Sequence, residues 1–91
     1  MKYSYSPIRI IIADDHEIFR EGFKLLFKNQ PEIELVGEAE NGKELLGLAA
    51  ELQPDVVIVD IKMPVMDSIE ACKRICKQFS LIKVIALSMF N

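Results

Sequence analysis

The sequence lacks the features that mark membrane-bound, secreted or nucleic-acid-binding chains. No apolar run approaches the roughly 20 residues that a membrane-spanning helix needs. With 11 basic and 14 acidic residues the net charge is -3, so no basic surface for nucleic acids is expected. The amino-terminal residues have no signal-peptide pattern. We therefore expect one small cytoplasmic domain in these 91 residues, of which 51% are hydrophobic.

Cysteine is also scarce, and its spacing excludes the usual motifs. Cys72 and Cys76 are four residues apart, which fits neither a redox or zinc motif nor a disulfide framework. On a helix both side chains would share one face with Ile69, Ile75 and Phe79. We therefore expect both cysteines to be small buried hydrophobic residues.

Two apolar runs lead directly into aspartates. Val56–Val59 is apolar and mostly β-branched, which predicts a strand buried on both faces with Asp60 at its carboxyl end. Ile8–Ala13 predicts a second buried strand, which is followed by Asp14 and Asp15. In open α/β sheets, ligands bind at the carboxyl ends of the strands.

The segment from about residue 16 to residue 29 has helical periodicity. Its apolar stripe consists of Phe19, Phe23, Leu26 and Phe27. We expect the charged residues of this helix to face away from that stripe, namely Glu17, Arg20, Lys24 and Lys28.

Strand and helix patterns continue to alternate after this helix. Residues 33–39 alternate, with Ile33, Leu35, Gly37 and Ala39 on one face, which predicts a partly exposed edge strand. Asn41 followed by Glu44 resembles a capping box at the start of a second helix. The remaining predicted elements are a third helix that Asp67 and Glu70 would cap, and a last apolar strand over Ile82–Leu87 that leads into Ser88.

The order β-α-β-α-β-α-β with short connections predicts an α/β fold with a doubly wound, flavodoxin-like parallel sheet. In the strand order 2-1-3-4 the first and third strands are neighbours, so Asp14, Asp15 and Asp60 would share one crevice. Carboxylates this close repel one another, and a divalent cation would remove the repulsion. Oxygen ligands favour Mg²⁺ or Mn²⁺.

A carboxylate beside such a cation can attack phosphorus and form an aspartyl-phosphate, for which Asp60 is the candidate. Ser88, at the end of the neighbouring strand, could then hydrogen-bond the attached phosphoryl group. Simpler interpretations are open for the single residues. The Asp14–Asp15 pair also fits a turn or a helix cap, and His16 fits a first-turn helix residue better than a catalytic base.

Across residues 8–90 the sequence resembles response-regulator receiver domains of two-component signalling. The resemblance lies in three segments, Ile10–His16, Val57–Asp67 and Val84–Ser88. The pattern Asp14-Asp15-His16 with Arg20, Gly22, Leu25 and Leu26 is similar to the subgroup with a LuxR-type DNA-binding output domain.

This resemblance implies a phosphoacceptor switch in transcription regulation and not an enzyme. Asp60 would accept a phosphoryl group from a histidine kinase. Asp15 and Asp60 would ligate Mg²⁺ directly, Asp14 would do so through water, and the backbone carbonyl of Lys62 would complete the protein ligands. Ser88 matches the hydroxyl that moves toward the phosphate. DNA would be contacted only by an output domain, which these residues do not include.

Two departures from the family pattern stand out. Ser68 occupies a position that is usually glycine, and we expect it to be a harmless helix-start residue. We also expect residues 1–91 to be a receiver domain without the family's last helix, strand and helix, and therefore without its phosphate-pairing lysine. The fourth strand would then be an apolar edge, through which we expect two copies to associate.

Two other functions are weighed against the switch. A haloacid-dehalogenase-like phosphatase also uses an aspartate at a strand end and Mg²⁺, but it requires a second aspartate two residues later, where this chain has Lys62. An interaction module that keeps the fold without phosphorylation is the other alternative. The complete set of acidic residues argues against an interaction module, whereas the missing phosphate-pairing lysine argues for it.

Overall fold

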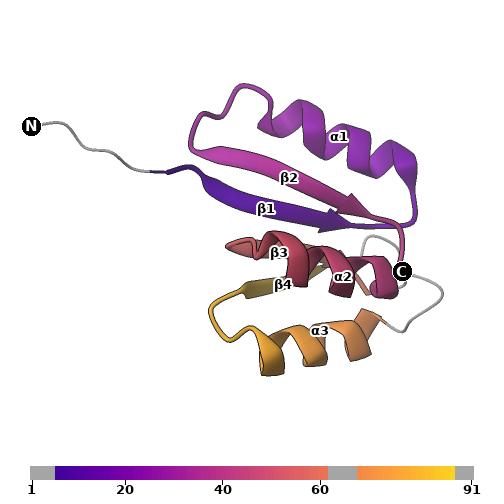
Figure 1. Ribbon diagram of the computed structural model, residues 1–91. Helices are drawn as coiled ribbons and strands as arrows, with labels where there is room; N and C mark the ends of the chain where they lie inside the picture. Colours follow the sequence, from indigo (N-terminus) through magenta and orange to yellow (C-terminus); the bar gives the residue numbers. More distant parts are fainter. Residues whose placement is uncertain (1–5, 62–67, 88–91) are drawn as a thin grey trace, which may run out of the picture.

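The computed structural model of the protein describes residues 6–61 and 68–87 (Figure 1). Strands and helices alternate along these residues in the predicted order. They are β1 (Ile8–Ala13), α1 (Glu17–Phe27), β2 (Ile33–Ala39), α2 (Gly42–Leu52), β3 (Val56–Asp60), α3 (Ser68–Gln78) and β4 (Lys83–Leu87). In the described part of the chain, no helix has the length and apolar character needed to cross a bilayer.

The described strands form one parallel sheet in the order β2-β1-β3-β4, which confirms the predicted flavodoxin-like arrangement. β1 pairs with β2 on one side and with β3 on the other. As an edge of the described sheet, β4 leaves Ile85 47% exposed. Association of two copies through this edge stays a prediction.

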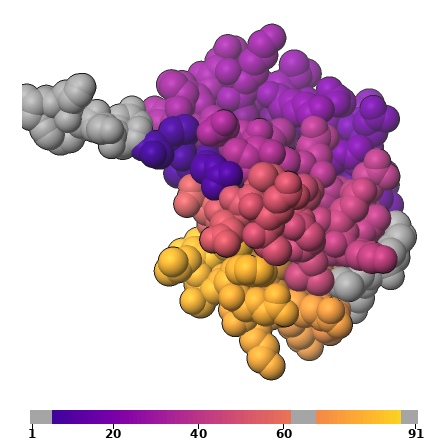
Figure 2. Space-filling model, viewed as in Figure 1, coloured from indigo at the N-terminus to yellow at the C-terminus, as the bar shows by residue number. Residues whose placement is uncertain are grey.

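The helices lie on both faces of the sheet (Figure 1). α1 covers one face, and α2 and α3 pack together on the other. The main core lies between the sheet and the α2–α3 layer; its buried members are Ile11, Ala13, Ala39, Leu45, Ala49, Val57, Val59, Ala71, Ile75 and Ile82. In Figure 2, α1 and β2 occupy one end of the molecule, while α3 and β4 occupy the other.

The start of α2 confirms the predicted cap and modifies one detail of it. The side chain of Asn41 accepts a hydrogen bond from the Glu44 backbone N–H at 2.8 Å. The Glu44 carboxylate accepts from the backbone N–H of Glu40 at 2.7 Å, one residue before the cap. Both bonds satisfy backbone donors at a helix start, where no intrahelical partner exists.

A β-bulge in β2 overturns the strict alternation expected there. Ile10 pairs with Leu35 and Ile11 pairs with Gly37, so Val36 is an extra residue between them. Leu35 consequently lies on the α1 face, whereas Gly37 packs against α2. Because one inserted residue reverses the facing of those that follow, Glu38 also lies on the α1 face.

Arg20 departs from the expectation that the charged residues of α1 lie away from its packed apolar stripe. It is buried, and its Nε donates to Glu38 Oε1 at 3.0 Å. Its Nη1 donates to the backbone carbonyl oxygen of Asp14 at 2.5 Å. Lys24, one turn further on, places its Nζ 2.6 Å from Glu38 Oε2. The bulge thus provides the carboxylate that makes burial of Arg20 tolerable.

The expectation that both cysteines are buried is wrong. Cys76 is exposed and Cys72 is only partly buried, because the face of α3 that carries them borders an apolar hollow. Ser68 is fully buried as the first residue of α3, and its Oγ has no hydrogen-bond partner among the described residues. Its backbone is helical, as expected, but the buried hydroxyl carries a desolvation penalty.

The Glu38 cluster predicts an acid-dependent stability. Burial raises the pKa of Glu38, but hydrogen bonds from Lys24 and Arg20 outweigh burial and lower the pKa below its ordinary value of 4.5. A lowered folded pKa contributes stability above the unfolded pKa, and that contribution is lost as pH falls through the folded pKa. We expect Glu38→Gln to lower the free energy of unfolding at pH 7 by about 1–3 kcal/mol, measured by urea denaturation.

The difference between the parent and Glu38→Gln should shrink below pH 4.5, where the parent's own carboxylate becomes protonated. The matched control is Glu34→Gln, which removes an exposed carboxylate from the same strand. A difference between Glu38→Gln and the parent that stays constant down to pH 3 would contradict this account.

Ser68 generates a second prediction. Ser68→Ala removes a buried hydroxyl that has no described partner and keeps the side chain small. We expect the free energy of unfolding to rise by about 1 kcal/mol, because the desolvation penalty disappears. Ser80→Ala, at an exposed position, is the control and should change little. A loss of stability in Ser68→Ala would show that the hydroxyl stabilises the fold.

Candidate functional site

The candidate site lies where β1 and β3 end side by side. Ala13 pairs with Val59, so the residues that follow them, Asp14 after β1 and Asp60 as the last residue of β3, lie at the same edge of the sheet. Asp14 and Asp60 are buried, and Asp15 is more open to solvent. The Asp14 backbone N–H also donates to the Ala39 carbonyl of β2 at 2.9 Å, which holds the start of this loop against the sheet.

The predicted convergence of the three acids is confirmed by their geometry. Asp14, Asp15, Asp60 and His16 each offer a ligand atom, and these atoms all lie within 4.8 Å of one another. Three carboxylates at this separation suit a hard cation that prefers oxygen ligands. The donor set therefore fits Mg²⁺.

His16 takes a larger part in the site than its sequence position indicated. It precedes the first turn of α1, and its Nδ1 lies 2.8 Å from Asp14 Oδ1 and 3.0 Å from Asp15 Oδ1. The hydrogen bond to Asp14 raises the pKa of His16, and the charges of Asp15, Asp14 and Asp60 act in the same direction, while burial opposes them. Without a metal ion, an imidazolium can neutralise part of the carboxylate charge.

Two predicted site residues lie outside the described residues. They are Lys62, whose backbone carbonyl was expected as a metal ligand, and Ser88, the expected switch hydroxyl. Leu87, the neighbour of Ser88, pairs with Asp60, and its carbonyl accepts from the Ile61 N–H at 3.0 Å. The roles of both residues stay predictions.

Arg20 is the contributor that periodicity alone missed. Its hydrogen bond to the Asp14 carbonyl reaches the site from α1. Helical spacing placed Arg20 away from the apolar stripe, and only the pairing of β2 with β1 brings Glu38 within its reach.

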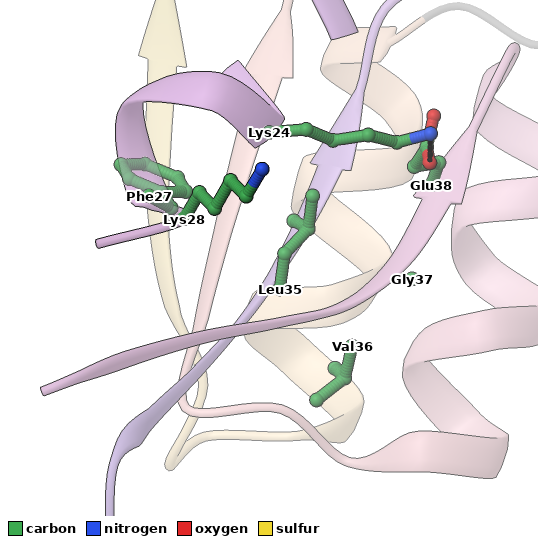
Figure 3. Close-up of a pocket in the computed structure, with 7 residues that line it drawn as sticks. All are labelled: Lys24, Phe27, Lys28, Leu35, Val36, Gly37 and Glu38. Carbon is green, nitrogen blue, oxygen red and sulfur yellow. Dashed lines mark ion pairs between the residues drawn. The ribbon is translucent and has the colours of Figure 1, made fainter. Parts of the chain in front are cut away.

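The hollow drawn in Figure 3 is a separate feature of the α1–β2 side. It has a volume of about 330 Å³ and is lined by Lys24, Phe27, Lys28, Leu35, Val36, Gly37 and Glu38. None of the three clustered aspartates lines it. Its lysines and apolar side chains lack the converging acids of the β1–β3 edge, so we place the candidate site at that edge.

Comparison with known proteins shows which class this fold and site define. Residues 10–91 match the response regulator receiver domain family, and the chain belongs to it. It is a receiver domain of a two-component response regulator of the LuxR/NarL type.

Particular relatives agree with this assignment. The chain is 47% identical to the transcriptional regulatory protein LiaR of Bacillus subtilis over 83 residues, which cover 91% of the chain and 39% of LiaR. It superposes with a TM-score of 0.85 on a LuxR-family response regulator from Aurantimonas, at 32% identity, covering 94% of this chain and 61% of that one. With the receiver domain of Thermotoga maritima CheB the TM-score is 0.84 at 39% identity, covering 90% and 60%.

The chain therefore spans about two fifths of the length of a curated relative such as LiaR. The activities that such a relative has in the rest of its length are not activities of this receiver domain. Response regulators act mainly as switches, which agrees with the predicted non-enzymatic class.

Proposed function

We propose that this chain is a phosphoacceptor switch in which Asp60 receives a phosphoryl group from a histidine kinase with the help of Mg²⁺. The observation that carries the proposal is the cluster of Asp14, Asp15 and Asp60 within 4.8 Å at the end of β3. A carboxylate at the end of a buried strand is held in one direction, which suits a nucleophile that must meet phosphorus in line.

The roles proposed within the site are those that membership of the receiver-domain family implies. Asp15 and Asp60 would hold the cation directly, Asp14 would hold it through water, and the Lys62 carbonyl would complete the protein ligands. The cation supplies charge compensation for the incoming phosphoryl group when it is bound. Ser88, after β4, would hydrogen-bond the phosphorylated Asp60, and this contact would bias the switch between two states.

The partners follow from the family. The donor of the phosphoryl group would be a histidine kinase in the cytoplasm. DNA would be contacted by an output domain outside these residues, as the LuxR-type relatives imply. The receiver domain itself has a net charge of -3, which does not favour binding to a polyanion.

Mg²⁺ should stabilise the folded protein. A ligand that binds only the folded state raises the free energy of unfolding, by about 2.7 kcal/mol at a concentration 100 times its Kd. We expect MgCl₂ to raise the Tm of the parent and to raise that of Asp15→Asn much less, measured by circular dichroism at constant ionic strength. Glu51→Gln, which removes an exposed carboxylate on α2, should keep the full rise. Equal rises in all three proteins would contradict a site at Asp15.

Phosphorylation of Asp60 is tested by incubating the protein with acetyl phosphate and MgCl₂ and measuring the intact mass. We expect one adduct with the mass of a phosphoryl group, and none after chelation of the metal. Asp60→Asn should give no adduct, because an amide is a poor nucleophile. The control is Asp55→Asn, which removes the carboxylate directly before the first residue of β3. This variant should be modified like the parent.

Other outcomes would favour the other functions. Absence of any adduct in the parent would favour an interaction module. Continuous release of phosphate without a stable adduct would favour a hydrolase.

A further inference from the structure

We propose that Arg20 is a positioning residue for the divalent-cation site, because it holds the peptide group that joins Asp14 to Asp15. This inference rests on the proposed function. Arg20 lies on a helix outside the acidic cluster, and its proposed role is to fix the direction of two ligands of the cation, Asp14 and Asp15.

The contacts of Arg20 join three elements of the fold. Its side chain is 9% exposed. Nε donates to Glu38 of β2 at 3.0 Å, and Nη1 donates to the Asp14 carbonyl oxygen after β1. Nη2 lies 3.8 Å from Glu40. Arg20 itself belongs to α1, so one guanidinium connects α1, β2 and the loop that carries the acids.

The Asp14 carbonyl is an effective point of control. A peptide group is planar, so the Asp14 carbonyl and the Asp15 nitrogen and Cα belong to one rigid unit. Orienting this carbonyl therefore orients the backbone from which the Asp15 side chain leaves. The Asp14 N–H is already held by the Ala39 carbonyl at 2.9 Å, so Arg20 supplies the second fixed point.

Only a guanidinium fits these two acceptors at once. Its N–H groups lie in one plane and point in different directions, so Nε and Nη1 can serve different acceptors. A lysine ammonium is a compact charge on a flexible chain, which would reach Glu38 or the Asp14 carbonyl but would not reproduce both bonds. The Glu38 carboxylate anchors the guanidinium, and its pKa is lowered by its cationic partners against the effect of burial.

Lys24 offers a matched control on the same helix. It binds the same carboxylate, Glu38, at 2.6 Å, as Figure 3 shows, and it also binds Glu21 at 2.9 Å. Among the residues that the structure describes, the hydrogen bonds and ion pairs of Lys24 do not include Asp14. Removing Lys24 therefore weakens the attachment of α1 to β2 and leaves the Asp14 carbonyl bond in place.

The experiment measures Mn²⁺ affinity and metal-free stability separately. Mn²⁺ replaces Mg²⁺ because its free ion gives an electron paramagnetic resonance signal that binding removes. The parent, Arg20→Lys, Arg20→Met and Lys24→Met are titrated below their lowest Tm, and each Tm is measured without metal. We expect both Arg20 variants to bind Mn²⁺ about tenfold more weakly, the size of change that loss of an outer-shell contact produces.

Lys24→Met separates positioning from general loss of structure. We expect it to lower the metal-free Tm about as much as Arg20→Lys does and to keep the Mn²⁺ affinity of the parent within about twofold. The inference is overturned if Arg20→Lys binds Mn²⁺ like the parent, or if Lys24→Met loses as much affinity as Arg20→Lys. If the parent protein binds no Mn²⁺, both the proposed function and the positioning role of Arg20 fail. If the parent binds Mn²⁺ and the Arg20 variants bind it equally well, only the positioning role fails.

Discussion

The pairing of β1 with β3 is the constraint on which the rest of the structure depends. It puts the carboxyl ends of two buried strands side by side, with Ala13 opposite Val59. Asp60 ends β3 at that point, and Asp14 and Asp15 directly follow β1 there. The same pairing creates an electrostatic problem, because buried carboxylates repel one another unless a cation or a proton donor compensates them. The contacts of His16 and the fit to Mg²⁺ are both consequences of that problem.

The contacts that reach the candidate site from Glu38 through Arg20 begin in β2. The bulge at Val36 shifts the register with β1 and turns Glu38 toward α1. Glu38 then offers the carboxylate that Arg20 needs to be buried, and Arg20 extends to the Asp14 carbonyl. A backbone irregularity in an edge strand is in this way connected to the edge of the sheet where Asp14, Asp15 and Asp60 converge. Bulges often lie where a side chain has to be redirected, and this one follows that rule.

The apolar patterns were sufficient for the fold and for the main part of the site. Continuous β-branched runs identified β1 and β3, and the alternation of patterns identified a doubly wound parallel sheet with Asp14, Asp15 and Asp60 at one edge. The errors concern residues whose surroundings come from other segments. Helical spacing placed Arg20 away from the apolar stripe, both cysteines were expected to be buried, and Leu35 was placed on the same face as Gly37 and Ala39.

What the sequence determined by itself is therefore the order of elements and the ends of the strands, because these depend on local periodicity and on residues next to one another in the chain. The tertiary structure alone decided the shifted register of β2, the burial of Arg20 and the contact of His16 with two acids. These features arise from pairings between segments that are distant in sequence, and a one-residue change in register reverses which side chains can meet.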